Sequence, residues 1–138
     1  MLHNCVYMEP IKSVHQLSVC HLDEHFTLHP RLQKRITAAI DYIHDHYYDH
    51  ISQESLSIEV KISVPKLQAG LKQLTGHTLY SYHEQVKIKA AKSLLENTEL
   101  PLKAIAHKVG FKTHSHFGEV FKRTTKMTPS AYRNQYGQ

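Results

Sequence analysis

The chain reads LSIEVKISVPKL at residues 56–67 and IAHKVGFKTHSHF at residues 105–117, which are two copies of one pattern. Matching positions lie 49 residues apart before the turn in each copy and 50 apart after it, so the second turn is one residue longer. The second halves match as well, with Thr75, Thr78 and Tyr82 repeated as Thr125, Thr128 and Tyr132. The repeat predicts two units, each built from two short helices and a tight turn.

The whole chain after residue 30 is predicted to be all-α. Apolar residues recur at helical spacing, and no stretch alternates as a strand would. Ser52, Ser63 and Thr113 stand where N-caps are expected, and Pro65 lies where a first helical turn tolerates proline. Seven helices are expected, over residues 31–48, 53–60, 63–74, 79–96, a segment opened by Pro101, 113–123, and a last one from Thr128 to Tyr132.

The predicted helix at 79–96 connects the two units. Its 18 residues span about 27 Å, which can hold two recognition helices near the ~34 Å separation of successive major grooves. Its core-facing stripe is expected at Tyr82, Val86, Ala90 and Leu94. Its lysines are expected to face solvent or phosphate: Lys87, Lys89 and Lys92.

The charge is unevenly distributed along the chain. The net charge is +5, yet residues 1–58 carry four basic and seven acidic groups, and residues 59–138 carry thirteen basic and five acidic groups. A polyanion such as nucleic acid is the natural partner for the basic half, since neutralised phosphates release counterions. A basic surface that is merely solvated remains the alternative. The repeated apolar residues are assigned to the core: Leu56, Leu67, Leu71, Ile105, Phe117 and Phe121.

The second copy and the residues after it closely resemble the signature of the AraC/XylS transcription regulators. The resemblance rests on residues 105–117, 120–123 and 128–133, and the first copy is similar through residues 67–72. It covers about 31–134 and implies an all-α, homeodomain-like DNA-binding domain. This domain would have a first helix-turn-helix unit at 31–77, a linking helix at 78–96 and a second unit at 97–134. The resemblance also implies a cytoplasmic bacterial protein, with double-stranded DNA and RNA polymerase as partners and activation as its usual role.

The resemblance assigns contact residues to the polar faces of the two recognition helices. The positions expected to face bases are Pro65, Gln68 and Ala69 in the first and His114, Ser115, His116 and Glu119 in the second. Gln68 can pair with adenine through two hydrogen bonds, and Glu119 can accept from a cytosine amine or else repel phosphate. The lysines expected at phosphates are Lys66, Lys72, Lys112 and Lys122.

Five positions depart from the family pattern. Ala69 and Glu119 stand where relatives often carry arginine, and Lys87 replaces a frequent arginine on the linking helix. Lys61 and Lys126 occupy places where glycine is common, so both turns are expected to be slightly strained or differently shaped. These changes are expected to leave the fold intact and to affect which DNA sequence is recognised.

Residues 1–30 carry a separate expectation. Leu2, Cys5, Tyr7 and Pro10 resemble the segment between the sensor barrel and the DNA-binding half of siderophore-type regulators. In that interpretation an effector-sensing domain is missing from this chain; the alternative is a complete small regulator. Cys5 and Cys20 are expected to be free thiols, with a structural disulfide as the alternative.

Other functions fit the sequence less well. Thirteen histidines raise a metal-binding alternative through Cys20, His21, His25 and His29, but no Cys-x-x-Cys pair completes a site. Ala69 and Glu119 keep open a protein-interaction module that has lost DNA binding. No Gly-rich phosphate loop, nucleophile elbow or His-Glu-x-x-His pair is present, so no enzyme, metal or cofactor is expected. No apolar run is long enough to span a bilayer.

Overall fold

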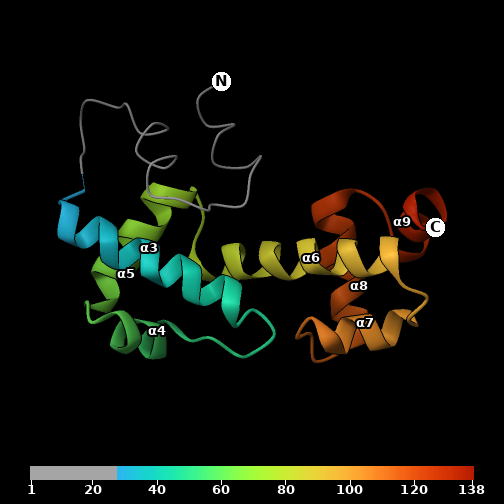
Figure 1. Ribbon diagram of the computed structural model, residues 1–138, viewed down its shortest axis with the longest axis horizontal. Helices are drawn as coiled ribbons and strands as arrows, with labels where there is room; N and C mark the ends of the chain where they lie inside the picture. The colour runs from blue at the N-terminus through green and yellow to red at the C-terminus, as the bar shows by residue number, and fades with distance from the viewer. Residues whose placement is uncertain (1–27) are drawn as a thin grey trace, which may run out of the picture. The chain divides into compact units, whose positions relative to one another are not determined.

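A computed structural model describes residues 28–138, and within them the chain forms seven α-helices and no strand (Figure 1). The helices are α3 (Pro30–Asp45), α4 (Gln53–Val60), α5 (Val64–Thr75), α6 (Leu79–Asn97), α7 (Leu102–Lys108), α8 (His114–Thr125) and α9 (Pro129–Tyr136). The predicted all-α class and the seven helices are confirmed. The predictions made for residues 1–27 fall outside the described residues.

The chain divides into two compact units. Unit 1 consists of residues 28–45 and Ile51–Tyr82, and unit 2 consists of His46–His50 and His83–Gln138. The division therefore falls inside α6, after its first turn, and the short loop that follows α3 belongs to unit 2.

Unit 1 is held together by an aliphatic core in which α3, α4 and α5 pack on one another. Its largest fully buried side chains are Ile36, Ile40, Ile43, Leu56, Leu67 and Leu71. Gly70 permits a close approach of α5 to α3, because a Cβ built there would lie 2.4 Å from the side chain of Ile36. Each buried aliphatic side chain contributes on the order of 1.5–3 kcal/mol of hydrophobic stabilisation.

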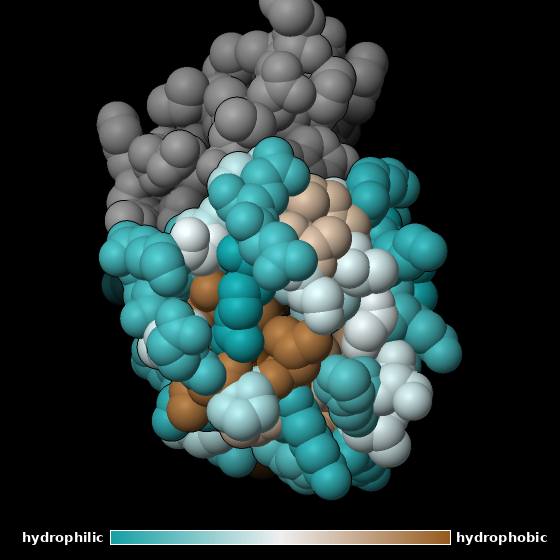
Figure 2. Space-filling model, turned by 90° about the vertical axis from the view of Figure 1, so that its right-hand side faces the viewer, coloured by the Kyte–Doolittle hydropathy of each residue, from teal (hydrophilic) through white to brown (hydrophobic). Residues whose placement is uncertain are grey.

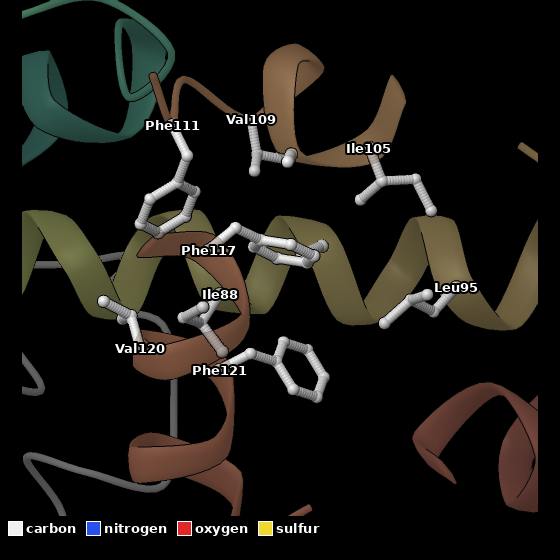
Figure 3. Close-up of a cluster of buried hydrophobic side chains, with 10 residues drawn as sticks. Ile88, Leu95, Ile105, Val109, Phe111, Phe117, Val120 and Phe121 are labelled. Atoms are coloured by element: carbon white, nitrogen blue, oxygen red, sulfur yellow. The ribbon is translucent and has the colours of Figure 1, made fainter. Parts of the chain in front are cut away.

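Unit 2 has a core rich in aromatic rings (Figure 3). Figure 3 shows side chains of α7 and α8 directed toward α6. The ring of Phe121 contacts Phe117 and Tyr132 edge-on, with centroids 5.7 and 5.4 Å away. Leu94, Leu100 and Leu102 pack against this core but remain partly exposed. Figure 2, in which the side bearing the C-terminus faces the viewer, shows apolar surface between polar side chains.

The hydrogen bonds of the two units repeat at the spacing of the sequence pattern. Ile62 N donates to Ser57 O at 3.1 Å, and Phe111 N donates to Ala106 O at 2.9 Å. Thr75 Oγ1 donates to Leu71 O at 2.6 Å, and Thr125 Oγ1 donates to Phe121 O at 2.8 Å. Because the backbone and side-chain bonds both recur, the repeat is structural as well as sequential.

Caps explain where the helices begin. Ser52 forms a capping box with Ser55 at the start of α4. Thr113 and Thr128 each accept a hydrogen bond from the backbone N–H three residues on, at the starts of α8 and α9. Ser63 occupies the N-cap position of α5, but its side chain makes no capping bond. The N-cap positions predicted from sequence are therefore confirmed, although the Ser63 side chain does not accept a capping hydrogen bond.

The buried face of α6 differs from the expected one. Tyr82 is buried as predicted, but Val86, Ala90 and Leu94 are only partly buried. The buried residues further along are Ile88, Ala91 and Leu95. The helix carries apolar residues on two adjacent stripes. The stripe that packs against α7 and α8 is not the one predicted from the sequence.

Candidate nucleic-acid interface

Helix α5 presents an exposed polar face opposite its buried stripe. Pro65, Lys66, Gln68, Ala69 and Lys72 are all exposed, while the neighbouring Leu67 and Leu71 of the same helix are fully buried. Every residue that the resemblance assigns to DNA contact on α5 therefore lies on the surface.

A contact that the sequence did not reveal holds one of these side chains. The Gln68 amide Nε2 donates to Oε1 of Gln53, at the start of α4. This bond leaves the second N–H and the Oε1 of Gln68 available, and these are the two groups that pair with adenine.

Helix α8 has the same arrangement in unit 2. Its buried stripe is Phe117, Val120 and Phe121. The residues assigned to DNA contact are all exposed: Lys112, His114, Ser115, His116, Glu119 and Lys122. Thr113 caps the helix by accepting from His116 N at 3.1 Å, so the first turn, where three of these side chains begin, is fixed by a local bond.

His116 differs from the other assigned residues because its ring has contacts within the protein. The ring lies edge-on to Phe111, with centroids 5.6 Å apart. Its Nε2 lies 3.9 Å from Oε2 of Glu84 on α6, an ion pair when the imidazole is protonated. About half of the side chain is still exposed.

Glu84 also binds the last turn of α8. Arg123 donates from its guanidinium to Glu84 Oε1 at 2.9 Å. The sequence assigned no role to Glu84 or Arg123, because the two residues are 39 positions apart and neither belongs to the repeated pattern. Only the fold brings them together.

Lys87 does not extend into solvent as the sequence predicted. Its Nζ donates to Gly110 O at 3.2 Å and lies 5.0 Å from the centroid of the Phe111 ring. Burial lowers the pKa of Lys87, and the neighbouring Glu84 carboxylate opposes that shift. Lys87 therefore supports the turn before α8. The Nζ of Lys92 lies 5.9 Å from the centroid of the Tyr132 ring.

Within residues 28–138, the turns at the ends of the helices pass through left-handed backbone at four places. Lys61 has φ 59° and ψ 46°, and Lys126 has φ 67° and ψ 11°. Gly76 and Gly110 have φ of 79° and 98°. The prediction that Lys61 and Lys126 are strained is confirmed, because side chains with a Cβ rarely adopt this region.

His83 anchors the loop of unit 2 that follows α3. Its Nε2 lies 2.6 Å from the backbone oxygen of Tyr47, to which the neutral ring donates. Burial lowers the pKa of His83; the Tyr47 carbonyl opposes the shift, and the charge of Lys87 adds to it. The buried ring is therefore held in its neutral form.

The tyrosine of the repeat is partnered in each unit. Tyr82 OH lies 2.9 Å from His44 Nε2, and Tyr132 OH donates to Glu96. Burial raises the pKa of both phenols to about 12. Each hydroxyl therefore remains neutral and links two helices, α3 with α6 in unit 1 and α6 with α9 in unit 2.

The metal alternative gains no support in the described part of the chain. Residues 28–138 contain no group of three or more His, Cys, Asp or Glu side chains that could hold a metal ion. Of the four proposed ligands, Cys20, His21 and His25 lie outside the described residues, and His29 Nδ1 accepts from Arg31 N at 3.2 Å. No helix within 28–138 has the length and apolar character needed to cross a membrane.

Known proteins share this sequence and this fold. Residues 56–135 match the family described as "Helix-turn-helix domain". The chain is 34% identical over 108 residues to the arabinose operon regulatory protein of Salmonella typhimurium, covering 78% of this chain and 38% of that protein. It is 27% identical over 99 residues to the HTH-type transcriptional activator RhaS of Escherichia coli O1:K1 / APEC, covering 72% of this chain and 36% of that protein.

A solved structure supports the same family assignment. The fold is similar to the C-terminal domain of AraT, a response regulator from Geobacillus stearothermophilus, with a TM-score of 0.70 and 26% identity over 82% of this chain and 91% of that one. The chain spans less than two fifths of the length of the two curated regulators that it matches. These relatives are regulators of transcription rather than enzymes, as the sequence predicts. With its duplicated helix-turn-helix units and the match over residues 56–135, the chain belongs to the AraC/XylS family of helix-turn-helix transcription regulators.

Proposed function

We propose that this chain binds double-stranded DNA sequence-specifically and regulates transcription by inserting α5 and α8 into successive major grooves. The observation that carries the proposal is that all eleven residues assigned to DNA contact are exposed, while the opposite face of each helix is buried. A helix with an apolar face in the core and a polar face on the surface can enter a groove without unfolding.

The exposed faces of α5 and α8 carry two kinds of residue, those suited to contact bases and those suited to contact phosphates. Gln68, Ser115 and the two histidines can donate to or accept from base edges, whereas the Glu119 carboxylate can only accept; the histidines are His114 and His116. Pro65 and Ala69 offer apolar contact to a thymine methyl group. Lys66, Lys72, Lys112 and Lys122 flank these positions and would hold the backbone phosphates without reading the sequence.

The direction of regulation and the further partner are also part of the proposal. The curated relative RhaS is named as a transcriptional activator. Activation in this chain would require contact with RNA polymerase, and a purified transcription assay on a promoter that carries the bound site would detect it.

The binding test begins with selection of oligonucleotides from a random pool, followed by fluorescence anisotropy at several salt concentrations. Four phosphate contacts predict a slope of log K against log salt of about −3.6. Lys122→Ala should make the slope shallower by about 0.9 at every sequence. Lys34→Ala is the matched control, because Lys34 is an exposed lysine on α3 with no assigned contact.

Gln68→Ala tests base reading in the same assay. Loss of two hydrogen bonds to adenine should weaken the preference at one base pair by ~1–3 kcal/mol and leave the salt slope unchanged. Absence of binding, or binding that does not respond to salt, would refute the proposal. A protein-interaction module that has lost DNA binding would give that result.

A further inference from the structure

The carboxylate of Glu84 on α6 is unusual for a charged group near a surface. Its side chain is only 13% exposed, and its Oε1 accepts from Arg123 at 2.9 Å. Its Oε2 is buried and accepts no hydrogen bond within residues 28–138, with His116 Nε2 3.9 Å away. The pair links the last turn of α8 to α6, and a hydrogen bond between two charged groups is stronger than one between neutral groups.

Arg123 has a second possible partner on its own helix. Glu119 precedes Arg123 by four residues, and a glutamate four residues before an arginine is the favoured arrangement for a pair along a helix. The structure shows the other pairing. Arg123 turns to Glu84, and Glu119 is exposed with no hydrogen bond or ion pair seen within residues 28–138.

We infer that Glu84 is a specificity-determining positioning residue, which withdraws Arg123 from Glu119 and thereby keeps the Glu119 carboxylate free to accept from a cytosine amine. The inference rests on the proposed function of α8 as a base-reading helix. Glu84 itself does not touch DNA.

The physical reason is competition for one guanidinium. A carboxylate paired with arginine has up to two of its acceptor sites filled and its charge neutralised, so it discriminates less well for an amine donor on a base edge. Neutralising Glu84 removes the stronger, charged partner of Arg123. Arg123 then turns to Glu119, and the preference for cytosine is lost although Glu119 is still present.

The experiment compares five proteins on the selected DNA site: the wild type, Glu119→Gln, Glu84→Gln, Arg123→Ala and Glu84→Gln/Arg123→Ala. The measured quantity is the ratio of affinities for the site and for its single-base-pair variants, by competition anisotropy at about pH 8. Melting temperature and far-UV circular dichroism of each variant confirm that it is folded. Glu119→Gln identifies the base pair that Glu119 reads, where discrimination should fall about tenfold.

Glu84→Gln should cause a similar loss at that same base pair and little change elsewhere. Removing Arg123 as well should restore the discrimination, because no guanidinium remains to occupy Glu119. Arg123→Ala alone should keep the wild-type preference at lower overall affinity. If Glu84 acted only on stability, a second substitution at Arg123 would not be expected to restore the discrimination.

The inference is overturned if Glu84→Gln keeps the wild-type preference, if the double variant fails to regain it, or if Arg123→Ala loses it. If Glu84→Gln does not fold, Arg123→Ala still tests the inference, because loss of the preference in that variant would overturn it. Failure of the proposed function looks different, since the wild type would then bind no selected site. A wild type that binds specifically but is unaffected by Glu119→Gln refutes only this inference.

Discussion

The turn between α4 and α5 in unit 1 passes through Lys61, whereas the matching turn of unit 2 passes through Gly110. At the ends of the recognition helices the order is reversed, with Gly76 in unit 1 and Lys126 in unit 2. All four residues are left-handed, so each unit uses one glycine and one lysine for the same two backbone positions.

The surroundings explain why lysine is tolerated at one turn and not at the other. Lys61 lies almost at the centre of the left-handed region, where a Cβ costs about 1–2 kcal/mol. Gly110 has φ 98°, and a Cβ there would lie 2.6 Å from the backbone oxygen of Tyr48. The requirement for glycine is therefore set by the neighbouring loop of unit 2 rather than by the turn alone.

Gly110→Ala should have the largest effect among the changes that test this comparison. The clash with Tyr48 and the strained φ together should lower the free energy of unfolding of unit 2 by about 3 kcal/mol. Urea unfolding followed by far-UV circular dichroism measures the change. Lys61→Ala is the control at the matching position and should stay within about 0.5 kcal/mol of the wild type. Equal losses in the two variants would show that the Tyr48 loop is not the cause.

Lys126→Gly should have a smaller effect of opposite sign. Glycine has no Cβ to strain at φ 67°, so the melting temperature should rise, in line with a gain of about 1 kcal/mol. Gly76→Ala is the mirror change in unit 1 and should lose about 1 kcal/mol at its φ of 79°. A gain in both variants, or a loss in both, would mean that the backbone conformation does not govern these positions.

The smallest expected effect is on the pH dependence of the melting temperature, to which each unit contributes one histidine. The pKa of His83 is lowered in the folded state from 6.5, so its contribution to stability is complete above that pH and is lost as the pH falls. His83→Gln keeps an N–H donor for Tyr47 but cannot titrate, so its melting temperature should decrease less between pH 7 and pH 5. The pKa of His77 in unit 1 is also lowered, so part of the decrease should remain. Identical slopes in wild type and variant would contradict this role of His83.

The elements that the sequence predicted correctly depend on local signals. The repeat, the caps at Ser52 and Thr113, and the buried stripe of each recognition helix all follow from residues within one or two helical turns. The six residues assigned to the core are fully buried for the same reason: Leu56, Leu67, Leu71, Ile105, Phe117 and Phe121. Surface exposure of the predicted contact residues then follows from helical periodicity.

What the sequence missed depends on contacts between distant residues. Glu84 and Arg123 meet across 39 positions, Gln53 and Gln68 across 15, and Lys87 and Gly110 across 23. Local periodicity carries no signal for such pairs. The buried stripe of α6 was misplaced for a related reason, since Ile88, Ala91 and Leu95 compete with a second apolar stripe on the same helix.

The loop at His46–His50 has a practical consequence for dissecting this protein. A truncated polypeptide that starts at residue 83 would retain every helix of unit 2 and still lack the acceptor for His83 and the ring of Tyr47 that packs against the aromatic core. Such a fragment should be poorly packed although its predicted helices are intact. A genetic fusion that supplies residues 46–50 in front of α6 would be the way to obtain the second half in isolation.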